Sequence, residues 1–183
     1  MNLLPFMTHI LGLHDPHAVE HSRNVNGLAS GLARKLGLPS RLVEQIEFSA
    51  AVHDIGKMAI NDFIVNKPGR FTEAEYLMVQ QHSQLGANMI ERLDLDPNIA
   101  AIVLQHHENF DGTGYPQRLS SDQISIGARI IRITDTYDAL MTHRGYRPAR
   151  SHQKAVSTME AEAQHFDPEI LDVFLRMRPN RNH

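Results

Sequence analysis

Cysteine is absent from the 183 residues of this chain. Disulfide bonds and thiolate-ligated metal sites are therefore excluded, and any metal ion must be held by imidazole and carboxylate groups. The absence of disulfides fits a cytoplasmic location, which we expect for this protein.

A long apolar run and a basic excess are missing as well. No stretch approaches the roughly 18 apolar residues of a membrane-spanning helix. The apolar start MNLLPFMTHILGLHDP has neither a basic N-terminus nor a small-residue cleavage site, so we expect no secretion signal. The formal net charge of -3 argues against nucleic acid as the main partner.

The chain does have enough apolar residues for a core, and it is rich in histidine. Hydrophobic residues make up 42%, which suffices for one compact domain of this length. We predict a single domain over residues 1–183, with a short lead at 1–11 and no receiver or sensor domain. The oligomeric state does not follow from the sequence. The 12 histidines are the unusual feature of the composition.

Apolar residues recur at helical spacing along almost the whole chain. One such series predicts a helix that ends at Gly37, and a second helix follows from about Arg41 through FSAAVHDIGK. Thr72 and Glu75 form the pattern of a capping box, which predicts a helix from there to about Leu93. The next helix runs through IAAIVLQHH.

The segment SSDQISIGARIIRITDTYDALMTH is rich in β-branched residues and would suit a strand by propensity alone. We predict a helix, because no second strand candidate exists to pair with it. SHQKAVSTMEAEA and DPEILDVFLRM predict two closing helices. The expected fold is an all-α bundle of about seven to eight helices with a metal cluster in its core.

Polar residues recur on the predicted apolar helices. In HDIGK, residues His53, Asp54 and Lys57 are three and four positions apart, so we expect them on one helix face. Similar spacing relates His17 to His21 and Asp135 to Asp138. Carboxylate and imidazole groups together suit iron, manganese or zinc, and one aspartate can bridge two ions. Without a metal, such buried groups would need costly mutual pairing.

Each of these features also has an ordinary structural explanation. A lone histidine such as His82 is more often a core or surface residue, and His53 with Asp54 can be a hydrogen-bonded couple. Asp135 can pair with Arg132, and DGTGYP has the residue types of a simple turn. The functional interpretation is favoured because all of these features occur together and in one order.

That order resembles the HD-GYP subgroup of the HD-domain phosphohydrolases. HDIGK carries the HD signature, and HHENFDGTGYP matches the subgroup's HHExxDGxGYP pattern at every fixed position. The resemblance extends from about Leu11 to Met177 and includes DPHAVEHSRNV, VNKPGRFTEAEY, GARIIRITDTYDALMTHRGYRPA and QHFDPEIL.

The resemblance implies a set of site residues. Asp54 would bridge two metal ions, and Lys57 would assist at the phosphate, so both count as catalytic. The implied metal ligands are His21, His53, Asp54, His82, His106, His107 and Asp135. The implied substrate contacts are Gly114, Tyr115, Pro116, Arg144 and Arg147.

The family resemblance also implies an activity. Its members hydrolyse cyclic di-GMP to the linear dinucleotide pGpG, and in some cases on to GMP, through a hydroxide that bridges two divalent ions. Iron or manganese is expected, because both accept imidazole and carboxylate ligands. The GYP loop is the expected contact for regulatory protein partners.

Three alternatives remain open at this point. The first is an HD phosphohydrolase for a mononucleotide, an alarmone or mixed cyclic GMP-AMP. The second is a regulatory module that binds a cyclic dinucleotide or a protein without turnover. The third is a di-iron oxygenase, because some HD-domain proteins use two irons with oxygen.

His17 marks a departure from one branch of the family. Members that resemble a three-metal form place a glutamate four residues before the first histidine ligand, and this chain has His17 there. A neutral imidazole supplies one donor atom and no charge, whereas a carboxylate supplies two oxygens and a negative charge. We expect two tightly held ions, with His17 unligated or a poor ligand of a third site. Linear dinucleotide should then accumulate over GMP.

Overall fold

A computed structural model describes residues 3–14, 16–142 and 150–177, and all regular structure in these ranges is helical. This confirms the all-α fold class. The α-helices are α1 (Leu3–His14), α2 (Pro16–Lys35), α3 (Ser40–Val52), α4 (Asp62–Val65), α5 (Glu73–Gln80), α6 (His82–Glu91), α7 (Pro97–Gln105), α8 (Ile126–Met141), α9 (His152–Ala161) and α10 (Pro168–Arg176). The 3-10 helices are η1 (Ile55–Ala59), η2 (Ser121–Gln123) and η3 (Ala163–His165).

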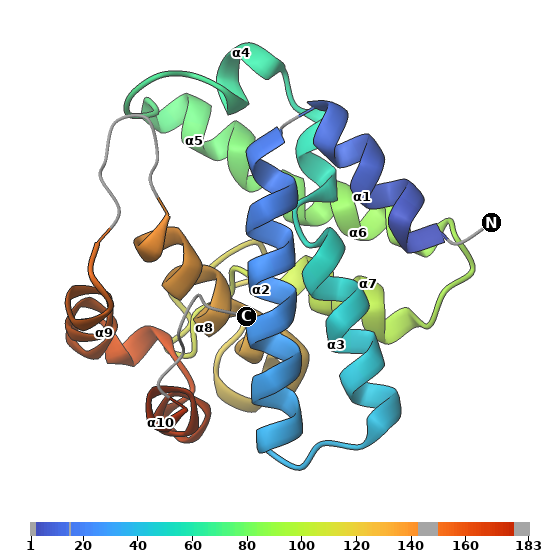
Figure 1. The fold of residues 1–183 in the computed structure, drawn as a ribbon. Helices are drawn as coiled ribbons and strands as arrows, with labels where there is room; N and C mark the ends of the chain where they lie inside the picture. Colours follow the sequence, from blue (N-terminus) through green and yellow to red (C-terminus); the bar gives the residue numbers. More distant parts are fainter. Residues whose placement is uncertain (1–2, 15, 143–149, 178–183) are drawn as a thin grey trace.

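Helix α2 lies in the middle of the bundle, between α3 on one side and α8 on the other (Figure 1). Its apolar face is fully buried at Val25, Ala29 and Leu32. These side chains belong to one large core that also contains apolar residues of α3, α7, α8, α9 and α10. The amphipathic helix predicted to end at Gly37 is confirmed as α2, whose last residue is Lys35.

A second, smaller core lies under α1. Met7 and Leu11 of α1 are buried there against apolar residues of α3, η1, α6 and α7. The last turn of α3 serves both cores, because Ala50 belongs to the large one and Val52 to the small one. The HDIGK segment therefore begins where the two cores meet.

The HDIGK segment is not one face of a continuous α-helix, and this part of the prediction was wrong. Helix α3 ends at Val52, and the chain continues through His53 and Asp54 into the 3-10 helix η1. Gly56 explains the close packing of η1: a Cβ there would lie 1.9 Å from the carbonyl oxygen of His82. Only glycine lets η1 approach the start of α6 this closely.

The helix predicted from Thr72 to about Leu93 is divided in two. Its start is confirmed, since the Thr72–Glu75 capping box is formed. However, α5 ends at Gln80 and α6 begins at His82, with Gln81 between them. This division and the short helix α4 are two reasons why the described residues contain more than the expected seven to eight helices.

The remaining helix predictions are confirmed. The β-branched segment forms α8, with Ile130, Ile131 and Ile133 fully buried. α9 and α10 are the two closing helices. No helix in the described ranges has the length and apolar character needed to cross a bilayer.

Candidate metal centre

Three histidines at helix ends share one local arrangement. His53 follows the last residue of α3, His82 is the first residue of α6, and His106 caps the C-terminus of α7. In each case Nδ1 lies within hydrogen-bond distance of the carbonyl oxygen three residues earlier: 2.8 Å to Ala50, 2.7 Å to Val79 and 2.6 Å to Val103. We infer that Nδ1 carries the proton in all three rings, which leaves Nε2 with a lone pair for a metal ion.

Asp54 lies at the centre of these rings and is 3% exposed. Its Oδ1 is 3.4 Å from Nε2 of His82, and its Oδ2 accepts a 2.5 Å hydrogen bond from Nζ of Lys57. Burial alone would raise the pKa of Asp54, but neighbouring positive charge, first of all that of Lys57, holds it well below its usual range. The carboxylate is therefore ionised.

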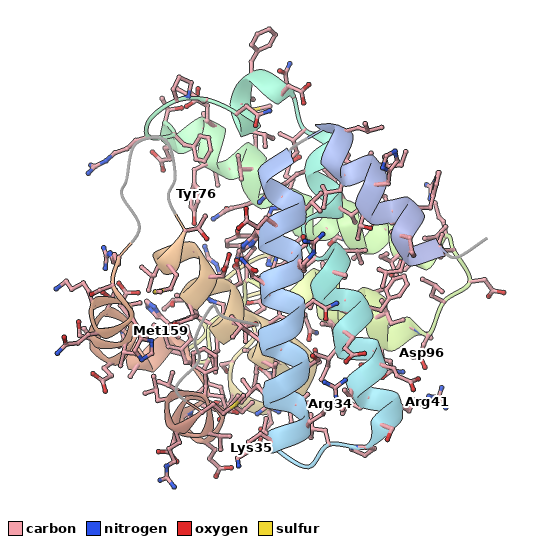
Figure 2. The ribbon with its side chains drawn as sticks, in the orientation of Figure 1. Arg34, Lys35, Arg41, Tyr76, Asp96 and Met159 are labelled. Atoms are coloured by element: carbon pink, nitrogen blue, oxygen red, sulfur yellow. The ribbon has the colours of Figure 1, made fainter. Side chains whose placement is uncertain are left out.

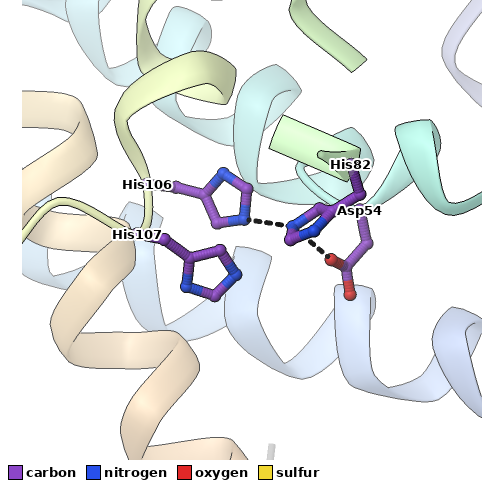
Figure 3. Close-up of side chains that lie close together, drawn as sticks. All are labelled: Asp54, His82, His106 and His107. Atoms are coloured by element: carbon purple, nitrogen blue, oxygen red, sulfur yellow. Dashed lines mark hydrogen bonds and ion pairs between the residues drawn. The ribbon is translucent and has the colours of Figure 1, made fainter. Parts of the chain in front are cut away.

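Potential ligand atoms form two groups that share Asp54, each with all its atoms within 4.8 Å of one another. We call Asp54, His82, His106 and His107 the α6–α7 half, which Figure 3 shows in close-up. We call His21, His53 and Asp54, together with the adjoining Asp135, the α2–α8 half.

The α6–α7 half consists of neutral imidazoles around one carboxylate. Nε2 of His82 lies 3.1 Å from Nε2 of His106, and the two rings meet edge to face (Figure 3). Burial lowers the pKa of His82 to about 4 and the pKa values of His106 and His107 well below the usual range. These rings are neutral at pH 7, so a metal ion can bind their lone pairs without displacing a proton.

The α2–α8 half has more negative charge. His21 Nε2 lies 3.1 Å from Oδ1 of Asp135, and its Nδ1 lies 2.7 Å from Oδ2 of Asp138. Burial would lower the pKa of His21, but its hydrogen bonds to these two aspartates raise it to about 9. Asn24 and Thr142 also donate hydrogen bonds to Asp138 and hold its carboxylate in place.

These donor atoms fit a metal ion. Nε2 of His53 is buried without a hydrogen-bond partner in the described ranges, although such atoms are normally paired. It faces Asp54, whose Oδ2 is 3.5 Å away. An unpaired imidazole nitrogen beside an ionised, shared carboxylate matches the donors that first-row metal ions prefer.

The GYP loop folds back onto the histidine pair. The ring of Tyr115 stacks on that of His107 at 4.8 Å, and the backbone N–H of Tyr115 donates to the carbonyl of His107. Gly114 is required here, because a Cβ would lie 2.2 Å from the backbone nitrogen of Asn109. The buried carboxylate of Glu108 accepts from the backbone N–H groups of Gln117 and Leu119.

A cavity of about 1280 Å³ opens above the centre. Its floor includes His21, Asp54 and His107. Its walls contribute aromatic and cationic side chains: Lys57, Lys67, Phe71, Tyr76, Tyr115, Arg118 and Arg132. This combination suits a ligand with flat rings and negative charge.

The structure brings the ligand set expected from the sequence into one place. His21, His53, Asp54, His82, His106 and His107 belong to the two groups, and Asp135 lies against His21. Their roles as ligands stay predictions, as do the substrate contacts. Gly114 and Tyr115 line the cavity, and Pro116 lines a smaller pocket beside it. The side chain of His17, and Arg144 and Arg147, lie outside the described part of the chain.

The sequence analysis missed several residues of the site. Asp138 was noted only for its spacing from Asp135, and that spacing was the available signal. Glu108 belongs to the HHE motif but had no assigned role. Arg132 precedes Asp135 by one helical turn and lies on the same face of α8. Tyr76, on α5, is the last residue of the VNKPGRFTEAEY segment but had no assigned role.

Comparisons with known proteins place the chain in a family. The HD domain family model matches residues 5–170. A cyclic di-GMP phosphodiesterase of Pseudomonas aeruginosa is 39% identical over 163 residues, covering 88% of this chain and 39% of that protein. A 3'3'-cGAMP-specific phosphodiesterase of Vibrio cholerae is 35% identical, covering 82% of this chain and 33% of that protein. The chain thus spans less than half the length of these relatives.

Solved structures share the fold. An HDG"Y"P protein from Bdellovibrio bacteriovorus aligns with a TM-score of 0.71 at 21% identity, covering 87% of this chain and 52% of that one. The HD domain of the L. monocytogenes phosphodiesterase PgpH in complex with cyclic-di-AMP aligns at 0.69 and 16% identity, covering 94% of this chain and 92% of that one. Taken with the HDIGK and HHENFDGTGYP segments, these findings show that the chain belongs to the HD domain family, in its HD-GYP branch.

Proposed function

We propose that this chain is a metal-dependent phosphodiesterase that hydrolyses cyclic di-GMP to linear pGpG. The observation that carries the proposal is Asp54, an ionised carboxylate shared by two groups of ligand atoms on the floor of a large cavity. The names of relatives such as the P. aeruginosa enzyme support the substrate. We include in the proposal a single domain over residues 1–183.

Two divalent ions, iron or manganese, would be held by the two halves of the centre. His82, His106 and His107 would bind one ion, His21 and His53 the other, and Asp54 both. Ions bound there supply a Lewis acid and lower the pKa of coordinated water toward neutrality. Asp135 is placed to add a carboxylate in the α2–α8 half. A third site at His17 is not part of the proposal.

The remaining site residues would bind and orient the substrate. Lys57 lines the cavity, and its Nζ donates a hydrogen bond to Asp54, so its charge would attract the scissile phosphate there. The rings of Tyr115 and Tyr76 meet edge to face with centroids 6.5 Å apart and would provide surfaces for a guanine base. Three further points stay predictions. They are substrate contacts from Arg144 and Arg147, a regulatory protein partner at the GYP loop, and a cytoplasmic location.

Mixed cyclic GMP-AMP is the second candidate substrate. Relatives named 3'3'-cGAMP-specific phosphodiesterases are 31–35% identical to this chain, close to the 32–39% of relatives named for cyclic di-GMP. The two substrates differ in one base and share both phosphodiester linkages. Residues at the aromatic walls of the cavity, and not those of the metal centre, would therefore decide between them.

The test is to purify the protein anaerobically, quantify bound metals and follow both cyclic dinucleotides in the same sample. Chelation should abolish the formation of linear dinucleotide, and Mn(II) or Fe(II) should restore it. Faster turnover of cyclic di-GMP supports the first substrate, and faster turnover of cyclic GMP-AMP the second. If the folded protein with filled metal sites hydrolysed neither cyclic dinucleotide, the proposed enzymatic activity would be refuted. A regulatory module that binds a cyclic dinucleotide without turnover would then be the remaining interpretation.

A further inference from the structure

Arg132 is a half-buried cation on the cavity wall that the proposed function leaves without a role. It lies on α8, one turn before Asp135. Its Nε donates a 2.9 Å hydrogen bond to Oδ1 of Asn109, and its Nη1 donates a 2.7 Å bond to Oγ1 of Thr136. The guanidinium also lies over the ring of Phe166, 5.6 Å from its centroid. All of these partners are uncharged.

The charge of Arg132 has no carboxylate within ion-pair distance in the part of the chain that the structure describes. Arg129, one turn earlier on α8, shows the usual arrangement, with Asp167 at 2.7 Å and Asp122 at 3.2 Å. A half-buried cation without a counter-ion is costly to desolvate. Its fixed position therefore points to an anion that arrives with the ligand.

The other cations of the cavity wall are engaged or exposed. Nζ of Lys57 pairs with Asp54, and Nζ of Lys67 pairs with both carboxylate oxygens of Glu75. Arg118 is exposed, so water screens its charge. Arg132 thus differs from them in being held rigidly, partly desolvated and not neutralised.

Arg132 also retains donors for such an anion. A guanidinium has five N–H groups in a planar fork, and the bonds to Asn109 and Thr136 use two of them. The others have no acceptor among the described residues. Because Arg132 lines the cavity, these donors are accessible to a ligand, and a phosphate can accept two of them together.

A cyclic dinucleotide brings two phosphodiester groups into one cavity. The scissile group must lie at Asp54 and Lys57, so the second group needs a separate cation. We propose that Arg132 binds this second, non-scissile phosphate and thereby sets the affinity for cyclic dinucleotides over simple phosphodiesters. The inference rests on the proposed function, because it assumes a substrate with two phosphates.

The test compares substrates with two phosphates and with one. Cyclic di-GMP and cyclic GMP-AMP have two, whereas bis(p-nitrophenyl) phosphate has only the scissile group. In Arg132→Gln, KM for both cyclic dinucleotides should rise about 10- to 100-fold, because a charge-assisted hydrogen bond is lost. KM for bis(p-nitrophenyl) phosphate and the metal content should stay unchanged. Arg132→Lys, which keeps the charge and loses the fork, should fall between wild type and Arg132→Gln.

Arg41→Gln is the matched control, since Arg41 is a highly exposed arginine paired with Asp96 and far from Tyr76 at the cavity (Figure 2). Unchanged KM values in Arg132→Gln would overturn the contact. An equal loss on bis(p-nitrophenyl) phosphate would also overturn it, because the defect would then lie at the scissile group. A loss that differs between the two cyclic dinucleotides would indicate a base contact instead. A wild type that cleaves bis(p-nitrophenyl) phosphate but binds no cyclic dinucleotide would refute the proposed function itself, and this contact with it.

Discussion

The two halves of the metal centre use the same kind of ring in different surroundings. In the α6–α7 half, His82 and His106 are oriented by backbone carbonyl oxygens three residues earlier, and Asp54 is the only carboxylate of the group. In the α2–α8 half, His21 is oriented by Asp138 and faces Asp135. The first half thus depends on Asp54 for all of its negative charge, whereas the second has negative charge of its own.

Replacing Asp54 should have the largest effect, because both halves share it. We expect Asp54→Ala to lose both ions and all turnover of cyclic di-GMP. Elemental analysis and product formation in one preparation check this. Asp172→Ala, which removes an exposed aspartate paired with Arg176, is the control and should keep both. If Asp54→Ala kept two ions, the shared carboxylate would be refuted.

Single histidine replacements should separate the halves. His106→Ala removes a ligand of the α6–α7 half only, and His21→Ala removes one of the α2–α8 half only. Each variant should hold about one tight ion instead of about two, with turnover lost in both, because a two-metal site needs both ions. Loss of both ions in either variant would show that the halves do not bind independently. Chelator competition on each variant makes the measurement.

Asp138→Asn tests the feature that distinguishes the α2–α8 half. The substitution replaces the carboxylate that orients His21 with an uncharged amide and leaves the predicted ligands unchanged. The affinity for one ion should therefore fall about 10- to 100-fold. Affinity for the other ion should not change. Thr142→Val, which removes one donor to Asp138, is the milder control. Equal weakening of both ions would contradict the assignment of Asp138 to one half.

Much of this comparison is predictable from the sequence. The HDIGK and HHE motifs contain His53, Asp54, His106 and His107, which the structure brings together, and the Thr72 capping box predicts the start of α5. The close approach of η1 at Gly56 to the start of α6, next to the division at Gln81, is a contact between distant segments, so no local pattern predicts it. The contact of His21 with Asp138 joins α2 to α8. That no described carboxylate pairs with Arg132 depends on all the elements packed around it, so local spacing predicts neither feature.

Tyr115→Ala should have the smallest effect, since the ring lies on His107 from outside both halves. Loss of a stacking surface should raise KM for cyclic di-GMP about tenfold with kcat and metal content largely kept. Tyr115→Phe keeps the ring and should behave almost as wild type. A variant that lost its metal ions would show that the GYP loop supports the centre itself.

The central claim is that one carboxylate joins two metal ions, and electron paramagnetic resonance of the manganese-loaded protein tests it most directly. Ions in a shared site lie roughly 3.5 to 4 Å apart, close enough for their spins to couple. Protein loaded with two equivalents of Mn(II) should give the signal of a coupled pair, and His21→Ala should convert it to the six-line signal of an isolated ion. A six-line signal from the fully loaded wild type would contradict the shared role of Asp54.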